Sequence, residues 1–136
     1  MKFYVMASAE RREEVAAFYD KLRARGHEIV ADWTTGDDIN PPFDARPEVT
    51  SFVERDVAGV LEADVIVKLS GKREGIGSNF KFGMGVAAFV IRGKPLVYAT
   101  AEDTSGNPYY FHSAVRVRKD LDSVLEEVER EAAKKN

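Results

Sequence analysis

The sequence predicts an α/β fold, a flavodoxin- or Rossmann-like three-layer sandwich with a five-stranded, mainly parallel sheet. Short apolar runs alternate along the chain with longer amphipathic segments. Short runs rich in β-branched and aromatic residues are typical of buried strands, and the longer segments have the apolar spacing of helices. Strands that alternate with helices form right-handed crossovers, which gives a parallel sheet with helices on both faces.

The first elements are expected to be a strand, a helix and a second strand. The run at 3–6 has four apolar residues and is too short for a helix. Ser8 follows it and is placed to cap a helix at 9–25, where apolar residues recur at helical spacing. Gly26 is a typical stop for this helix, because glycine readily adopts the left-handed backbone of a helix C-terminus. A second strand is expected at 27–32.

A loop without apolar periodicity covers 33–47 and contains three prolines. Loops of this length are usually lids, binding loops or disordered segments. A helix is expected at 48–61 and a third strand at 64–69, followed by a glycine-rich turn at 70–78 and a helix at 79–92.

The remaining elements complete the sheet. A fourth strand at 94–99 is followed by a polar loop at 100–108. The aromatic segment 109–112 is expected either as an edge segment of the sheet or as an aromatic lid. A short fifth strand is expected at 114–117, and the closing helix at 119–135 has acidic residues in its first turn and lysines in its last.

The composition argues against several classes of function. We expect residues 1–136 to form one domain, large enough to bury a core without disulfides or a metal. A net charge of -3 and a pI near 5.5 lack the surplus of cations that grips a nucleic acid polymer. With no cysteine and two histidines, no metal site is expected. No apolar run approaches the ~20 residues of a membrane span, so we expect a cytoplasmic protein that does not enter membranes.

Two nucleotide-binding motifs are missing, and we expect no cofactor. The turn after the first strand lacks Gly-x-Gly-x-x-Gly, and the glycine-rich turn lacks the Walker A spacing. In open parallel sheets, ligands bind outside the carboxyl ends of the strands. The connections to search for a site are therefore 6–10, 32–47, 70–81 and 100–112.

Small residues in these connections indicate how a ligand could be held. Ser8 stands at a helix N-terminus, which suits an anion, although a serine that only caps the helix gives the same pattern. Gly75 and Gly77 allow a ligand to approach the backbone closely. Gly83 and Gly85 lie inside the expected helix, where glycine is unfavourable, and indicate tight packing against the sheet or another subunit.

Several segments carry a resemblance when they are taken in order. They are Leu-Arg-Ala-Arg-Gly-His-Glu-Ile-Val at 22–30, Arg-Asp-Val at 55–57, Glu-Ala-Asp-Val-Ile-Val at 62–67, Gly-Ser-x-x-Lys-x-Gly at 77–83 and Arg-Gly-Lys-Pro-Leu at 92–96. With the opening strand and the Ser8 turn, they resemble the nucleoside 2-deoxyribosyltransferase family, which includes small 2'-deoxynucleoside 5'-monophosphate N-glycosidases.

This resemblance implies cleavage or exchange of the N-glycosidic bond of a deoxynucleoside. Family members attack the anomeric carbon with the glutamate of a Gly-Thr-x-x-Glu-x-Gly motif and hold the sugar hydroxyls with an aspartate. By position, Asp56 matches that aspartate, Ser8 the edge of the phosphate or sugar pocket, and Ser78 the hydroxyl of the turn. Lys81 falls at the nucleophile position. The family also implies a homodimer or larger homo-oligomer whose pockets are completed by a neighbour.

Lys81 changes what the resemblance implies. An ammonium repels the positive charge of an oxocarbenium-like transition state, which a carboxylate stabilises. The ordinary mechanism is therefore expected to fail. A lysine in the first turn of a helix calls for a nearby anion, either Glu74, Asp56 or a phosphate of the ligand. A neutral Lys81 that forms a Schiff base with an opened sugar is a further alternative, which requires a strongly lowered pKa.

Several other side chains have both a functional and a structural interpretation. Four carboxylates could replace the missing glutamate: Glu74, Asp37, Asp38 and Asp44. The alternative is that each of them is simply exposed to solvent. The aromatic side chains that could stack on a base, or pack in the core or a lid, are Trp33, Phe43, Tyr109, Tyr110 and Phe111. His112 is either a general acid or a structural hydrogen-bonding group, and His27 is expected to be structural.

Three functions follow from the sequence. We expect the protein to bind a nucleoside, a nucleotide or a related phosphosugar. It is then either an N-glycosidase or transferase that uses a displaced carboxylate, or a ligand-binding protein or a sensor of nucleotides or phosphosugars that lacks the nucleophile. The third function is a structural subunit of an assembly, with an interface formed by the helix at 79–92.

Overall fold

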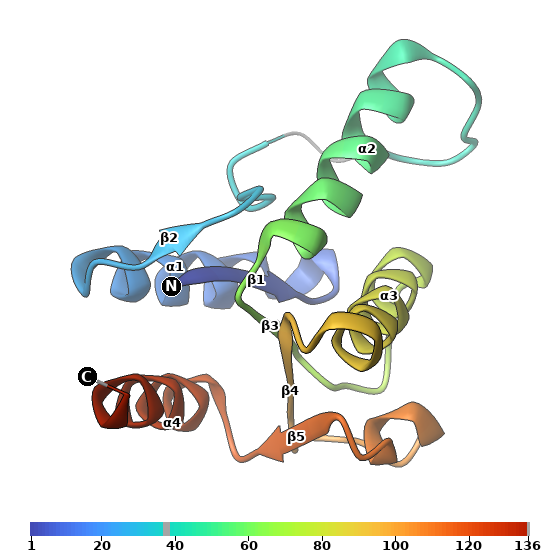
Figure 1. Cartoon of the computed structure of the whole chain (residues 1–136). Coiled ribbons are helices and arrows are strands. Elements are labelled where there is room, and N and C mark those ends of the chain that lie inside the picture. The colour runs from blue at the N-terminus through green and yellow to red at the C-terminus, as the bar shows by residue number, and fades with distance from the viewer. Residues whose placement is uncertain (37–38, 136) are drawn as a thin grey trace.

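A computed structural model describes residues 1–36 and 39–135 and confirms the α/β three-layer fold (Figure 1). All five strands run parallel, in the order β2-β1-β3-β4-β5. The strands are β1 (Lys2–Met6), β2 (Glu28–Ile29), β3 (Val65–Lys68), β4 (Leu96–Thr100) and β5 (Val115–Arg118). The helices are α1 (Arg12–Ala24), α2 (Pro47–Glu62), α3 (Ile76–Arg92) and α4 (Leu121–Lys134), with short 3-10 helices η1 (Ala9–Arg11) and η2 (Pro108–Phe111).

The direction of the strand order reverses at β1. From β1 the chain first goes outward to β2 and then returns to β3 on the other side of β1. Met6 of β1 pairs with Lys68 of β3, so the carboxyl ends of these strands lie side by side. This is the switch point of an open parallel sheet, where ligands usually bind.

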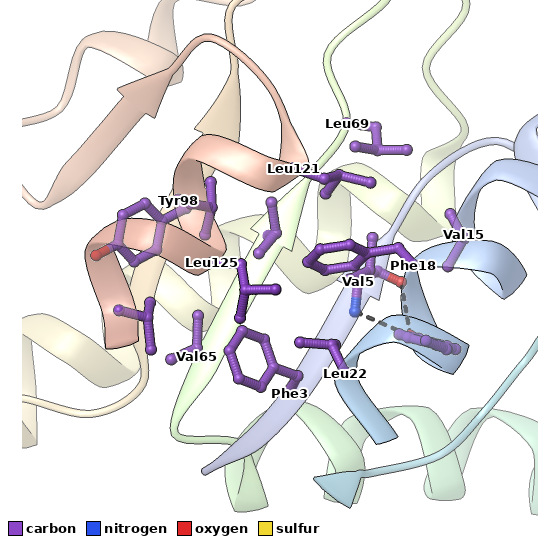
Figure 2. Close-up of a cluster of buried hydrophobic side chains, with 14 residues drawn as sticks. Phe3, Val5, Val15, Phe18, Leu22, Val65, Leu69, Tyr98, Leu121 and Leu125 are labelled. Carbon is purple, nitrogen blue, oxygen red and sulfur yellow. Dashed lines mark hydrogen bonds between the residues drawn. The ribbon is translucent and has the colours of Figure 1, made fainter. Parts of the chain in front are cut away.

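Helices α1 and α4 cover one face of the sheet. The side chains of Phe18, Leu22 and Leu125 pack with Phe3 and Val65 in one buried cluster, and Figure 2 shows these side chains converging. Burial of such side chains is the main favourable contribution to folding. The cluster therefore fixes both helices on this face.

Helices α2 and α3 cover the opposite face, where Tyr4, Val60, Ile66 and Phe82 pack in a second cluster. A Cβ atom at Gly85 would lie 2.1 Å from Ile66 Cδ1, so the absence of a side chain allows α3 to approach β3. Tight packing is thus confirmed for Gly85. At Gly83 an added Cβ would meet nothing within 4 Å, so the packing expected there is wrong within this chain.

Several element boundaries differ from the expectation, and for two of them the backbone shows the cause. The second strand has only two residues, Glu28 and Ile29, because Ala31 has a positive φ of 58° that ends the extended backbone. Helix α3 begins at Ile76, three residues earlier than expected, since the Asn79 amide already donates to the Gly75 carbonyl at 3.1 Å. Lys81 therefore lies in the second turn of α3 and not in its first.

The first helix and the aromatic segment also differ locally. Ser8 precedes η1 and makes no side-chain capping bond, so the capping expected of it is wrong, and its hydroxyl donates to Glu10 at 3.4 Å. Residues 108–111 form η2 and not an edge strand, because the Asn107 side chain accepts from the Tyr109 amide at 2.9 Å and closes a helical turn. Among the described residues, no helix has the length and apolar character needed to span a membrane.

Candidate functional site

A cavity of about 480 Å³ lies between α2 and α3, and we name it the α2–α3 cavity. Its walls are mostly apolar, and its charged side chains are Asp56 and Lys81. In Figure 1 the N-terminal turns of α2 and the connection before them extend beyond the sheet, on the side of α3. The lining residues are Ile39, Phe43, Val49, Phe52, Val53, Asp56, Val57, Ile76, Gly77, Phe80 and Lys81.

Lys81, Asp56 and Tyr4 form a closed hydrogen-bonded group at the charged end of this cavity. Lys81 Nζ donates to Tyr4 Oη at 2.8 Å and lies 3.2 Å from Asp56 Oδ2. The Tyr4 hydroxyl donates to Asp56 Oδ1 at 3.4 Å. Burial, with the charge of Asp56, raises the pKa of Tyr4 far above its usual range, so this hydroxyl stays protonated.

Three separate elements bring these groups together. Tyr4 comes from β1, Asp56 from the middle of α2, and Lys81 from the second turn of α3. The side chains of Asp56 and Lys81 are 10% and 14% exposed, so a small part of each remains open to the cavity. Of the anions considered from sequence, the structure thus gives Lys81 the partner Asp56.

Glu74 belongs to a different group, at the carboxyl end of β3. Its Oε1 lies 3.5 Å from Lys68 Nζ and accepts a short hydrogen bond from the Tyr110 hydroxyl. Its Oε2 accepts from Asn107 Nδ2 at 3.3 Å. The Lys68 side chain is 1% exposed, and burial lowers its pKa although the Glu74 carboxylate opposes this shift. Glu74 is therefore held by three donors from two segments, the end of β3 and the turn at 107–110.

Glu74 borders two smaller cavities. One, of about 360 Å³, lies between α3 and the 106–109 segment and is named the Glu74 cavity; Asn79, Gly83 and Tyr109 contribute to it. The other, of about 320 Å³, is named the Ser8 cavity and is lined by residues 8–10 and 73–75. The substrate-binding candidates thus separate: Gly77 lines the α2–α3 cavity, Ser8 and Gly75 line the Ser8 cavity, and Tyr109 lines the Glu74 cavity.

Two further candidates lie inside the structure. The Trp33 indole N–H donates to the Val5 carbonyl at 2.7 Å, and its ring packs against both buried clusters with the Arg12 guanidinium 5.9 Å away. The hydrogen bond to Val5 holds Trp33 against the carboxyl end of β1. Ser78 is buried in the first turn of α3, and its hydroxyl has no hydrogen-bond partner among the described residues.

The remaining candidates lie at the surface or outside the described residues. Phe43 is exposed at the α2–α3 cavity, and Asp44 pairs with Arg46 at 2.6 Å. Asp37 and Asp38 lie outside the described residues. His112 Nδ1 accepts from the Ala114 amide at 3.0 Å, and His27 lies 3.2 Å from Glu129.

Sequence reasoning missed Tyr4, Lys68 and Asn107. Lys68 carried a signal, because it is a charged residue at the carboxyl end of an otherwise apolar strand. Such a lysine is buried only when it is paired. Tyr4 and Asn107 carried no comparable signal, since an apolar strand and a polar loop are their ordinary surroundings.

One solved structure shares this fold. A solved structure of the CMP N-glycosidase BcmB from Clostridium botulinum matches with a TM-score of 0.54 and 12% sequence identity. The match covers 95% of this chain and 99% of that chain. No protein-family model and no curated protein matches the sequence. At this identity the likeness shows a shared fold over nearly the whole of both chains.

Proposed function

We propose that the protein binds a nucleoside or nucleotide in the α2–α3 cavity without cleaving it by the glutamate mechanism. The observation that supports this most directly is the cavity itself, with apolar walls and the Asp56–Lys81 pair among them. Binding sites for small molecules commonly combine apolar walls with a few fixed polar groups. The fold of a CMP N-glycosidase supports the same ligand class.

The cavity offers both kinds of contact that a nucleoside needs. Phe43, Phe52 and Phe80 supply aromatic faces for a base. Asp56 supplies acceptor oxygens for sugar hydroxyls, and Lys81 supplies a donor.

Lys81 is the reason to propose binding without cleavage. Its ammonium lies where the family resemblance places a nucleophilic glutamate, and it is bonded to Asp56 and Tyr4. A positive charge at that point disfavours an oxocarbenium-like transition state. The Asp56 carboxylate already accepts hydrogen bonds from Lys81 and Tyr4. We therefore assign it to ligand binding and not to nucleophilic attack.

Calorimetric titration tests this proposal. We would titrate the common nucleosides, deoxynucleosides and their 5'-monophosphates into the wild-type protein and into Gly77→Leu. Gly77 lines the α2–α3 cavity, and an added Cβ there meets nothing within 4 Å, so a leucine is expected to occupy part of the cavity. Binding by wild type and loss in Gly77→Leu are expected. If no ligand gave a heat of binding to the wild-type protein, the proposal would be wrong.

A second candidate function is cleavage by a displaced carboxylate, for which Glu74 is the candidate. Glu74 lies seven residues before Lys81, and its carboxylate lines two cavities near the carboxyl ends of the strands. Chromatography for released base after incubation with each ligand tests this function. Release by wild type that disappears in Glu74→Gln would establish it, and absence of release would exclude it.

We also propose that copies of this chain associate through α3, as a homodimer or larger homo-oligomer. Ile76, Phe80, Val90 and Ile91 are all exposed on this helix, Ile76 at 91% and Ile91 at 83%. Their spacing puts them on one side of the helix. Sedimentation of wild type and Phe80→Glu/Ile91→Glu tests this: the wild type should be an oligomer and the variant a monomer, whereas a monomeric wild type would contradict it.

A further inference from the structure

The Glu74 cavity is separate from the α2–α3 cavity and lies on the other flank of α3. Gly77 and Lys81 face one cavity, whereas Asn79 and Gly83 face the other. Successive residues of a helix are turned by ~100°, which accounts for this division. A ligand in one cavity is therefore held by different side chains from a ligand in the other.

Two glycines keep the Glu74 cavity open. At both Gly83 and Gly106, an added Cβ would meet nothing within 4 Å. Gly83 lies inside α3, where a glycine costs up to ~1 kcal/mol relative to alanine. Packing within the chain gives no reason for a glycine at this position. Contact with a second copy of the chain is one reason, and space for a bound group is the other.

The carboxylate of Glu74 has an acceptor position left for a ligand. An ionised carboxylate accepts about four hydrogen bonds. The Tyr110 hydroxyl and Lys68 Nζ are both on the side of Oε1, and Asn107 Nδ2 donates to Oε2. One position on Oε2 therefore remains, and the Glu74 side chain, 13% exposed, borders both the Glu74 cavity and the Ser8 cavity.

The charge around Glu74 determines the kind of donor that fits. Lys68 Nζ, 3.5 Å from Oε1, already balances the carboxylate. The buried Lys68 ammonium would repel a cationic ligand, whereas it would not repel a neutral N–H donor. The rings of Pro108 and Tyr109 border the cavity together with Gly83, which has no side chain, and they suit a planar group.

We propose that the Glu74 cavity is a second binding site, which takes a neutral planar heterocycle through an N–H donor to Glu74. The donor bonds to Oε2, and the ring lies between Gly83 and Tyr109. This site does not depend on the function proposed for the α2–α3 cavity.

A small probe without a sugar tests the site. We would titrate 2-aminopyrimidine, which is neutral at pH 7, and follow the backbone amides by NMR. Pyrimidine, 2-(dimethylamino)pyrimidine and benzylamine serve as probes that lack a neutral N–H donor. We expect 2-aminopyrimidine to bind at least tenfold more tightly than the other three, with shifts at residues 79, 83 and 106–109.

Two matched glycine variants separate the two cavities. Gly83→Leu fills the Glu74 cavity and Gly77→Leu fills the α2–α3 cavity, and neither added Cβ meets an atom within 4 Å. Gly83→Leu should weaken 2-aminopyrimidine binding at least tenfold, while Gly77→Leu should leave it unchanged. Glu74→Gln should weaken it by a similar factor if the variant folds.

Three results would overturn the proposal. They are no binding of 2-aminopyrimidine to wild type, equal binding of pyrimidine, and unchanged binding in Gly83→Leu. Nucleoside binding that is lost in Gly77→Leu would still support the α2–α3 site after any of these results, so the two proposals fail independently.

Discussion

Lys81 Nζ lies 3.2 Å from Asp56 Oδ2, which places the lysine of α3 against the aspartate of α2. Tyr4 Oη contacts both groups from β1. The family resemblance places a glutamate at position 81, which would stand beside Asp56 as a second carboxylate. The lysine instead forms an ion pair with Asp56, and the proposal of binding without cleavage rests on this pair.

Removal of the Lys81 ammonium should destabilise the protein. Lys81→Met leaves the Asp56 carboxylate mostly buried with only Tyr4 as its donor. Loss of one partner of a buried ion pair costs about 3 kcal/mol. Urea unfolding of Lys81→Met, Asp56→Leu and the double variant measures the coupling. The double variant should lose clearly less than the sum of the two single losses, and simple additivity would show that the ion pair is energetically irrelevant.

Lys81→Glu should make the fold more stable at low pH than at neutral pH and create base release. Two adjacent carboxylates raise the pKa of one of them in the folded state. A raised pKa in the folded state means that the fold binds more protons, so stability is greatest at low pH and is lost as the pH rises. Unfolding curves and chromatography of released base check both effects; Lys81→Gln is the matched control. An inactive Lys81→Glu that still binds nucleosides would show that other groups of the glycosidase site are missing.

The glycines of α3 should respond in opposite directions to alanine. Gly85→Ala puts a Cβ 2.1 Å from Ile66 Cδ1 and should cost about 1–3 kcal/mol. Gly83→Ala has open space and should stabilise the helix by up to about 1 kcal/mol. Thermal unfolding of both variants, and of Gly85→Ala/Ile66→Val, measures this. Similar losses in Gly83→Ala and Gly85→Ala would contradict the packing described.

Glu127 should contribute to acid unfolding. The Arg118 guanidinium donates to Glu127 at 2.7 Å and, together with Tyr98 and Arg116, lowers the pKa of this carboxyl to about 2. A lowered pKa in the folded state gives stability that is present above the usual value of 4.5 and is lost as the pH falls toward 2. Urea midpoints measured across this range should fall less steeply in Glu127→Gln than in wild type.

Glu126→Gln is the matched control for this experiment, because Glu126 is the exposed neighbour on α4. Its urea midpoints should follow the wild-type slope. Equal slopes in wild type and Glu127→Gln would show that the contacts with Arg118 and Tyr98 do not persist in solution.

The periodicity of the sequence was sufficient to predict the order of the elements and the parallel sheet. It was insufficient at the ends of elements, where single backbone contacts decide the boundary. The second strand stops at Ile29 because Ala31 turns out of the extended region, and no residue type marks that position. Helix α3 starts early because Gly75 accepts the first helical bond, although a glycine-rich stretch usually indicates a turn.

The candidate site was predictable only in part. Sequence reasoning left Glu74, Asp56 and a phosphate as possible anions for Lys81, and only the packing of α2 against α3 selects Asp56. For Trp33 the sequence could not separate two roles. A ring that stacks on a base and a ring that donates to a strand carbonyl have the same sequence pattern, and the structure shows the second. Two partners of Glu74, Asn107 and Tyr110, lie more than 30 residues away in the sequence, and local patterns do not connect them with Glu74.

The most direct test of the central claim is titration of nucleosides and their monophosphates into wild type, Gly77→Leu and Gly83→Leu. If the α2–α3 cavity is the nucleoside site, wild type should bind nucleosides saturably. Gly77→Leu should then bind them at least tenfold more weakly, and Gly83→Leu should bind them with wild-type affinity. Absence of binding to wild type, or equal affinity of wild type and Gly77→Leu, would contradict it.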